Sequence, residues 1–399
     1  MDLISVRTEE VASGRVRVTA AVAYDDRPGA TEDYWFEFPS GVAGALSDSG
    51  NGWLTCLAPM AAALGEPLRL PLPVDPLLLR NVREVMAIWQ SWYPRLHVVP
   101  LVAPSEAAVV PAAGRRAAMF FSGGVDSFFT LLHNEEPQVG NFPVDDLIAI
   151  HGFDILLENE EVFEKHSRRL ERVASEARKT LLLVRMNLRG TRLRELPMGE
   201  LWHGSALAAI GLLLERRYER LLLAASEDGP NLGPWGSHPL TDPLFSSSTT
   251  TFLHDGGAFA RWDKLEFLSR FDFAMRSLRV CSRDHSENCG ECEKCYRNVI
   301  ILDVLGVLDR SPTFPVRALD LRKVSHIFIR GWRTIFYEGL RRWAASRGRA
   351  DVAKAIGRSF RRSRWRRPLV QAAERVGKVR YGGRVSQWLK RTALAGRLR

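Results

Sequence analysis

Residues 117–132 have the sequence AAMFFSGGVDSFFTLL, and this stretch decides the fold. Its first five residues are apolar and form a run of strand length, while the apolar residues after Asp126 predict the start of a helix. Between these two segments, Gly123 and Gly124 allow the backbone to adopt positive φ and to approach an anion closely. Amides at a helix N-terminus attract phosphate, because they have no partners within the helix and lie at the positive end of its dipole. The stretch therefore predicts a strand, a phosphate-binding turn and a helix.

The sequence that follows alternates short apolar runs with helical segments. The predicted strands span 117–121, 147–151, 180–185 and 221–225, and the predicted helices span 126–133, 159–176 and 203–217. Alternation of this kind predicts an α/β fold with a doubly wound, mostly parallel sheet.

The residues before this region predict a smaller, β-rich α+β module at 1–110. Alternating polar and apolar residues predict strands at 15–24 and 33–39, with a turn at 26–29 and a further strand at 98–102; helical spacing appears at 54–64 and 76–92. Small residues and prolines at 103–114 are typical of a linker. We therefore expect three domains, at 1–110, 111–310 and 311–399.

Charge divides the chain unevenly. From Arg310 onward there are 25 basic and 4 acidic residues, a net charge of +21, whereas residues 1–309 hold 31 basic and 42 acidic residues, a net charge of −11. We expect the tail to be helical, and four partners fit its charge: the acidic body of the chain, a nucleic acid, an anionic membrane surface or an acidic protein.

Composition excludes several classes of protein. With 46% hydrophobic and 26% charged residues the chain can form a sizeable core. The sequence has no apolar run of the roughly 20 residues that a transmembrane helix needs, and no secretory signal pattern at its start. We expect a cytoplasmic protein, with a homodimer as one assembly state that the sequence leaves open.

Four of the five cysteines lie within fifteen residues, in the pattern C-x7-C-x2-C-x2-C formed by Cys281, Cys289, Cys292 and Cys295. Four thiolates converging from one loop suit a structural zinc ion, which takes four ligands in a tetrahedron. An iron–sulfur cluster is the alternative metal centre, and disulfide bonds are the alternative without a metal. A zinc site closed by four thiolates has no open position for water, so its expected role is to stabilise the fold.

The turn Ser122–Ser127 resembles the SGGxDS motif of the PP-loop ATP pyrophosphatases, which split ATP into AMP and pyrophosphate. It lacks the Gly-Lys-Ser/Thr of the Walker loop. This turn followed by the four-cysteine pattern resembles, in order, the 7-cyano-7-deazaguanine synthases. The resemblance implies an ATP-dependent carbon–nitrogen ligase of queuosine biosynthesis that adenylates a carboxylate and lets ammonia or another amine displace AMP. It also implies ATP, Mg²⁺ and Zn²⁺.

The resemblance extends from about 116 to 305, and its two motifs are specific. The chain departs from the family at two places. Ile150–Asp154 lacks the family's Tyr-Gly-Gln run, and Trp202–Ser205 stands where the family has an Arg-Asn segment. These departures leave the substrate carboxylate undefined.

The resemblance and the motifs together indicate which residues are expected to form the site. Those expected to bind the nucleotide are Ser122, Gly123, Gly124, Val125, Asp126, Ser127, His151 and Asp154. Those expected to act in catalysis are Asp126, Ser127, Asp228 and Lys264. Of these, Asp126 is expected to orient magnesium or cap the helix, and Asp228 follows a strand at its carboxyl end, where doubly wound sheets bind ligands. His238, in a Gly/Pro-containing loop expected at a sheet edge, is a further candidate, as is His203 at the start of an apolar helix, for which capping or a core hydrogen bond is the alternative role.

Two other functions remain open on the sequence. One is a tRNA-modifying PP-loop enzyme that adenylates a base carbonyl and holds RNA with the basic tail. Sulfur transfer by such an enzyme usually needs a reactive cysteine, and Cys56 alone lies outside the cluster. The other is a nucleotide-binding protein without turnover.

Overall fold

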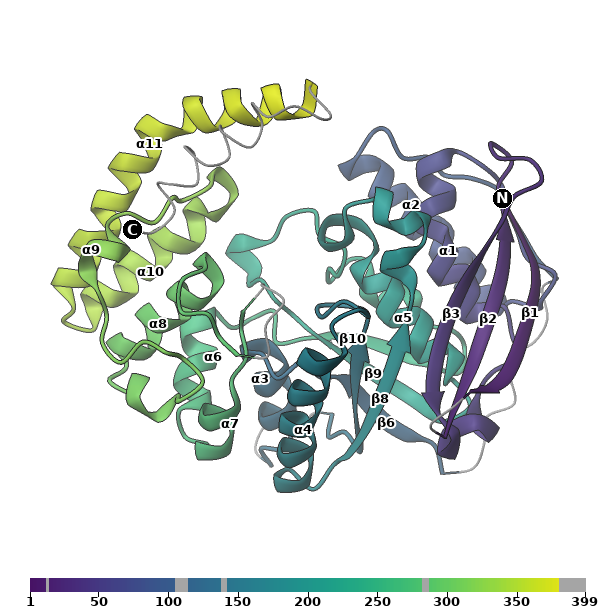
Figure 1. Ribbon diagram of the computed structural model, residues 1–399, viewed down its shortest axis with the longest axis horizontal. Coiled ribbons are helices and arrows are strands. Elements are labelled where there is room, and N and C mark those ends of the chain that lie inside the picture. Colours follow the sequence, from purple (N-terminus) through teal and green to yellow (C-terminus); the bar gives the residue numbers. More distant parts are fainter. Residues whose placement is uncertain (12–13, 105–113, 138–141, 282–286, 380–399) are drawn as a thin grey trace. The chain divides into compact units, whose positions relative to one another are not determined.

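The structure is a computed structural model that describes residues 1–11, 14–104, 114–137, 142–281 and 287–379 (Figure 1). The chain forms two compact units. The first contains residues 1–228 and 232–260, and the second contains 229–231 and the residues from 261 onward.

Among the described residues, ten strands of the first unit form one sheet (Figure 1). The strands are β1 (Asp2–Val11), β2 (Arg15–Ala23), β3 (Thr31–Pro39), β4 (Leu68–Arg69), β5 (Leu101–Val102), β6 (Arg116–Phe120), β7 (Asp146–His151), β8 (Thr180–Met186), β9 (Tyr218–Ala224) and β10 (Thr251–Asp255). Their order across the sheet is β10-β9-β6-β7-β8-β3-β2-β1-β4-β5. Six of the nine neighbouring pairs are parallel, so the sheet is mostly parallel.

The five parallel strands β6 to β10 place the turn Ser122–Ser127 at the centre of the α/β part; we call it the phosphate turn after its predicted ligand. From β6 the chain moves outward on one side to β7 and then β8. It then returns to the other side of β6 and adds β9 and β10. This order is compatible with a doubly wound sheet, in which the direction of winding reverses between β6 and β9. Ligands of such sheets bind at the carboxyl ends of the strands beside this reversal.

Helices of the first unit cover both faces of its sheet (Figure 1). They are α1 (Asn51–Leu64), α2 (Pro76–Trp92), α3 (Val125–His133), α4 (Glu160–Glu176) and α5 (His203–Leu213). Right-handed crossovers that run in opposite directions place α3 and α4 on one face and α5 on the other. Helix α5 is apolar on all sides because it packs between the sheet and α1. A Cβ atom at Gly52 would lie 2.8 Å from Leu213 Cγ, so this glycine permits the close approach of the two helices.

The N-terminal strands extend the same sheet. Strand β3 pairs antiparallel with β8, with Phe36 opposite Met186. Just beyond β8, the Asn187 side chain accepts from the Trp35 amide and donates to the Asp33 carbonyl, each at 2.8 Å. The strands predicted at 15–24 and 33–39 are confirmed as β2 and β3, and the four strands predicted for the α/β region are confirmed as β6 to β9. Strands β1, β4 and β10 were not predicted. The boundary at residue 110 lies outside the described residues, and the three domains stay a prediction, because compactness does not show which segments fold independently.

The second unit is helical in its described part. Its helices are α6 (Arg261–Leu268), α7 (Asp272–Ser277), α8 (Glu293–Val304), α9 (Leu321–Val324), α10 (Thr334–Ser346) and α11 (Ala350–Val379). The described tail is therefore helical, as predicted, and the cysteine cluster lies in the same compact unit. None of the helices in the described parts of either unit has both the length and the apolar character to cross a bilayer.

Candidate functional site

The phosphate turn follows β6 directly. The Phe121 amide donates to the Ile148 carbonyl, which keeps the chain in line with the sheet for one residue beyond the strand. Gly123 then adopts a φ of +70°, a conformation that L-residues rarely adopt. A Cβ atom at Gly123 would also lie 3.0 Å from Leu170 Cδ2 of α4. Conformation and space therefore both favour glycine at this position.

Two serine hydroxyls flank the turn. Ser122 Oγ lies 3.4 Å from Ser127 Oγ, and Ser127 Oγ donates to the Gly124 carbonyl at 3.1 Å. Ser122 is exposed, whereas Ser127 is 3% exposed. The turn thus presents one hydroxyl to solvent and holds the other against the backbone.

Helix α3 begins at this turn without a side-chain cap. Gly124 occupies the N-cap position, and no side chain of a described residue accepts a hydrogen bond there. The first backbone bond of the helix runs from the Phe128 amide to the Gly124 carbonyl at 3.0 Å. Amides of an uncapped first turn, together with two hydroxyls, form a donor set that fits phosphate oxygens. Asp126, in that first turn, is half-buried and provides a carboxylate beside them.

Asp228 follows β9, which is the neighbour of β6 on the side where the winding reverses. Its side chain is half-buried. The Ala225 amide donates to the Asp255 carbonyl at 2.7 Å, so the start of this loop is tied to β10. The structure therefore brings the loop of Asp228 and the phosphate turn to the carboxyl ends of adjacent strands.

His151 and Asp154 lie at the end of β7 and in the loop after it. His151 is fully buried and stacks on Phe163, with ring centroids 4.2 Å apart, and its Nε2 lies 3.0 Å from the Leu156 carbonyl oxygen. These contacts are those of a core histidine. Asp154 is exposed. Nucleotide contact by either residue stays a prediction.

Gly152 separates His151 from Asp154 and has a φ of +93°. A Cβ atom there would lie 2.0 Å from the Met186 carbonyl oxygen, so only glycine lets this loop pass over the end of β8.

Lys264 lies in the second unit, on α6, and is 2% exposed. The phosphate turn lies in the first unit. A buried ammonium group needs polar partners, but a role for Lys264 in catalysis stays a prediction.

A buried Asp–His pair was not predicted from the sequence. His254 Nδ1, on β10, lies 2.7 Å from Asp242 Oδ2, and their side chains are 6% and 0% exposed. The same carboxylate accepts from Ser237 Oγ at 2.6 Å and from the His238 amide at 3.1 Å. Asp242 therefore anchors the loop between β9 and β10. His238 packs edge-on against Trp92, and burial lowers its pKa, as does the nearby His254 imidazole.

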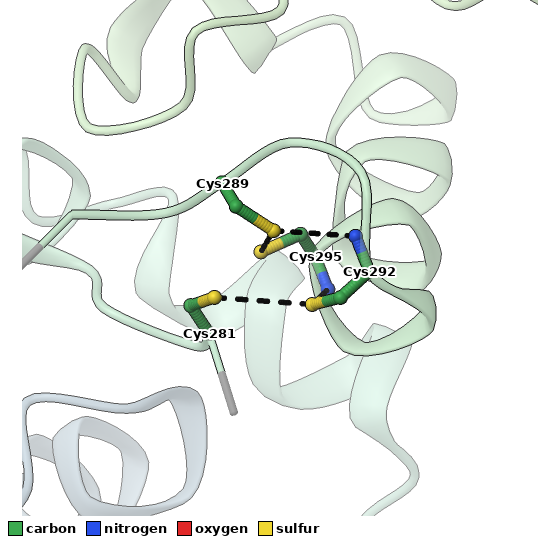
Figure 2. A group of neighbouring side chains, drawn as sticks. All are labelled: Cys281, Cys289, Cys292 and Cys295. Atoms are coloured by element: carbon green, nitrogen blue, oxygen red, sulfur yellow. Dashed lines mark hydrogen bonds between the residues drawn. The ribbon is translucent and has the colours of Figure 1, made fainter. Parts of the chain in front are cut away.

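The four predicted metal ligands converge (Figure 2). The sulfur atoms of Cys281, Cys289, Cys292 and Cys295 all lie within 4.8 Å of one another, and these residues form a group that could hold a metal ion such as zinc. The pairs 281–292 and 289–295 have sulfur–sulfur distances of 3.9 Å. In a tetrahedral zinc site the sulfur atoms lie about 3.8 Å apart, as follows from a Zn–S distance of about 2.3 Å. A disulfide would need about 2.05 Å, so the predicted alternative of disulfide bonds does not fit these cysteines, which are all unbridged.

Backbone amides point at the sulfur atoms of the cluster. The Cys292 amide donates to Cys289 Sγ at 3.2 Å, and the Cys295 amide donates to Cys292 Sγ at 3.3 Å (Figure 2). The second of these bonds caps α8, whose positive N-terminal end lies at the cluster. Both contacts stabilise thiolates over thiols.

Without a cation in the cluster, the Cys295 thiol resists ionisation. The hydrogen bond with Cys292 raises the pKa of Cys295 well above its usual range, and burial raises it further. Four neighbouring thiolates therefore require a positive charge between them, which is the condition that a bound metal ion satisfies.

Asn288 ties the backbone beside Cys281 to the rest of the cysteine loop, and no sequence pattern indicated this role. Its Oδ1 accepts from the amides of Val280 and Cys281, at 2.8 and 3.2 Å. Its Nδ2 donates to the Leu278 carbonyl at 2.9 Å and to Thr313 Oγ1 at 3.1 Å. Asn288 is 3% exposed, so all four bonds are shielded from water.

Comparison of the chain with protein-family models, with curated proteins and with solved structures found no match.

Proposed function

We propose that this chain is an ATP-dependent ligase of the 7-cyano-7-deazaguanine synthase type. It would adenylate a small-molecule carboxylate and release pyrophosphate, after which ammonia or another amine would displace AMP. The observation that supports this most is the position of the turn Ser122–Ser127. It joins β6 to an uncapped helix beside the reversal of the sheet, where doubly wound sheets bind ligands.

The turn supplies the donors for the phosphates of ATP in this proposal. Ser122, Gly123, Gly124, Val125 and Ser127 provide hydroxyl and amide hydrogens that stabilise the charge that develops on pyrophosphate as it leaves. Magnesium would neutralise phosphate charge, and the carboxylates of Asp126 and Asp228 have the oxygen donors it prefers.

The chemistry begins with two displacements, which give an amide; when the amine is ammonia, a second ATP would adenylate the amide oxygen, and loss of AMP and of the protons on nitrogen would leave the nitrile. A carboxylate oxygen of the substrate attacks the α-phosphorus, the bond from that phosphorus to pyrophosphate breaks, and a mixed anhydride forms. The amine nitrogen then attacks the acyl carbon, AMP leaves, and the amine loses a proton. The protein contributes mainly orientation and charge stabilisation. Contact of His151 and Asp154 with the nucleotide, and a charge-stabilising role of Lys264, are part of the same proposal.

The cysteine cluster is proposed to bind zinc in a structural role. Four thiolates complete a tetrahedron, so no coordination position remains for water or substrate. The cluster also packs within the unit that contains the tail helices.

A product assay tests the ligase. Purified full-length protein is incubated with ATP, magnesium, ammonium and 7-carboxy-7-deazaguanine, and AMP, pyrophosphate and the nitrile are measured. AMP and pyrophosphate in equal amounts, dependent on the carboxylate, support the proposal. AMP that appears only when tRNA is added supports the tRNA-modifying alternative, and ATP binding without AMP supports the non-enzymatic one. Release of ADP and phosphate contradicts all three.

A further inference from the structure

Helix α11 presents a basic stripe along its exposed side. Lys354, Arg358, Arg361 and Trp365 are spaced i, i+4, i+7 and i+11, which places them on one helix face, and all four are exposed. Trp365 is 83% exposed, the largest exposed fraction among the exposed large apolar side chains of the described chain. We call these four residues the α11 stripe.

The opposite side of α11 fixes the orientation of the stripe. Val352 and Ile356 are buried in the core of the second unit. Ser359 Oγ donates to the Val324 carbonyl, and Ser363 Oγ accepts from the Ile329 amide at 2.9 Å. Because the apolar and small residues dock inward, the stripe is not used for packing within its unit.

The stripe also differs in its ion pairs from three arginines that precede it in the second unit. Arg341 is bound to Glu338, Arg347 to Glu266 and Arg349 to Asp303, at 2.6 to 2.7 Å. For Lys354, Arg358 and Arg361, by contrast, no ion pair occurs with any residue that the structure describes. These cations keep their charge available for a partner.

We propose that the α11 stripe binds single-stranded nucleic acid. Lysine and arginine contact phosphates and release counterions, and an exposed tryptophan between arginines provides a flat ring on which a base stacks. A membrane surface fits less well, because an interfacial helix needs a continuous apolar face in the bilayer, and the apolar side chains described in the first turns of α11, those of Val352, Ala355 and Ile356, are buried. An acidic protein would use the charges but leave the tryptophan ring without a stacking partner. This inference does not depend on the proposed ligase activity.

The test is fluorescence anisotropy with full-length protein and a labelled single-stranded RNA of mixed sequence, at several salt concentrations from about 50 to 200 mM. The charge variant is Arg358→Gln with Arg361→Gln. Its matched control is Arg341→Gln with Arg347→Gln, which removes the same charge from arginines that are already ion-paired. We expect the charge variant to bind at least tenfold more weakly and the log–log salt slope to fall by about 1.4, since each single-strand phosphate contact contributes about 0.7. The control should bind almost as well as the wild type.

Trp365→Ala separates stacking from charge. It should weaken binding about tenfold at every salt concentration and leave the slope unchanged, because a stacked base releases no counterion. Unchanged thermal midpoints show that each variant is folded. Equal RNA binding by the charge variant and its control would overturn the proposal. The proposal would also be overturned if the charge variant lost binding to phosphatidylserine vesicles while its RNA binding stayed intact. Absence of RNA binding by the wild type at about 50 mM salt would overturn it as well.

Discussion

Ser122 Oγ lies 3.4 Å from Ser127 Oγ, across the turn that joins β6 to α3. Residues on both sides of two glycines therefore converge on one point at the carboxyl end of β6. Asp126 precedes Ser127 in the chain and lies in the first turn of the helix.

Asp126→Asn should abolish the formation of AMP and leave the fold intact. The change removes a negative charge from a half-buried position where no described side chain caps the helix. AMP production and the thermal midpoint are to be measured together. Glu84→Gln is the control, since Glu84 is exposed on α2 and undergoes the same chemical change. Normal turnover in Asp126→Asn would contradict the assignment of the site.

Cys292→Ser should reduce bound zinc from about one ion per chain to none and lower the thermal stability of the second unit. Cys292 both contributes a sulfur atom and accepts the amide hydrogen bond that caps α8. Elemental analysis measures the metal, and absorbance in the visible range distinguishes colourless zinc from an iron–sulfur cluster. The control is Cys56→Ala, which removes a buried thiol outside the cluster and should keep its full complement of metal.

Asn288→Ala should lower the free energy of unfolding by about 2 to 3 kcal/mol, because it leaves buried amides and a carbonyl without partners. Chemical denaturation measures this change. The variant should also release zinc to a chelator faster than the wild type, since Asn288 fixes the backbone of Cys281. Glu291→Gln, in the same loop but exposed, serves as the control. Chelator release at the wild-type rate would show that Asn288 does not position the ligand.

The surroundings of the Asp146 carboxylate predict that the stability of the fold depends on pH. This carboxylate is bound by Arg116 at 2.5 Å, Arg217 at 2.7 Å and the Tyr218 hydroxyl at 2.8 Å, and the side chain is 1% exposed. Burial opposes ionisation, but hydrogen bonds from the two arginines and the tyrosine outweigh it, so the pKa of Asp146 lies below its usual range.

A carboxyl whose pKa is lower in the folded state stabilises the protein above its unfolded pKa, and this contribution is lost as the pH falls. Asp146→Asn should therefore cost about 3 kcal/mol near neutral pH and less below about pH 4. Denaturation curves at a series of pH values measure the difference. A constant difference across that range would exclude a titrating carboxylate as its cause.

The elements that were predicted from the sequence have local causes. The apolar run at 117–121 and the glycines after it specify a buried strand and a turn wherever they occur, and the spacing of the cysteines brings their sulfur atoms together within one loop. Strand β10 was missed because it follows a hydroxyl-rich run and ends in His254 and Asp255. Its strand conformation depends on pairing with β9.

Features that depend on distant residues were not predictable. The bond between Asp242 and His254 spans twelve residues and two elements, and Asn288 stands in a polar loop with no periodicity to mark it. The pairing of Phe36 with Met186 depends on residues far apart in the chain. Hydrophobic patterns specify which face of a strand is buried, but they do not specify its neighbour.

The pairing of β3 with β8 has a consequence for how the chain reaches this structure. Phe36 leaves the ribosome 150 residues before Met186, so the hairpins of β1 to β3 have an unpaired edge during most of the synthesis of the first unit. Sheets built from such distant pairs fold slowly, and an open strand edge recruits other chains. Nascent or truncated chains that end before residue 180 should therefore aggregate through β3, which makes β8 the segment that completes and protects the sheet.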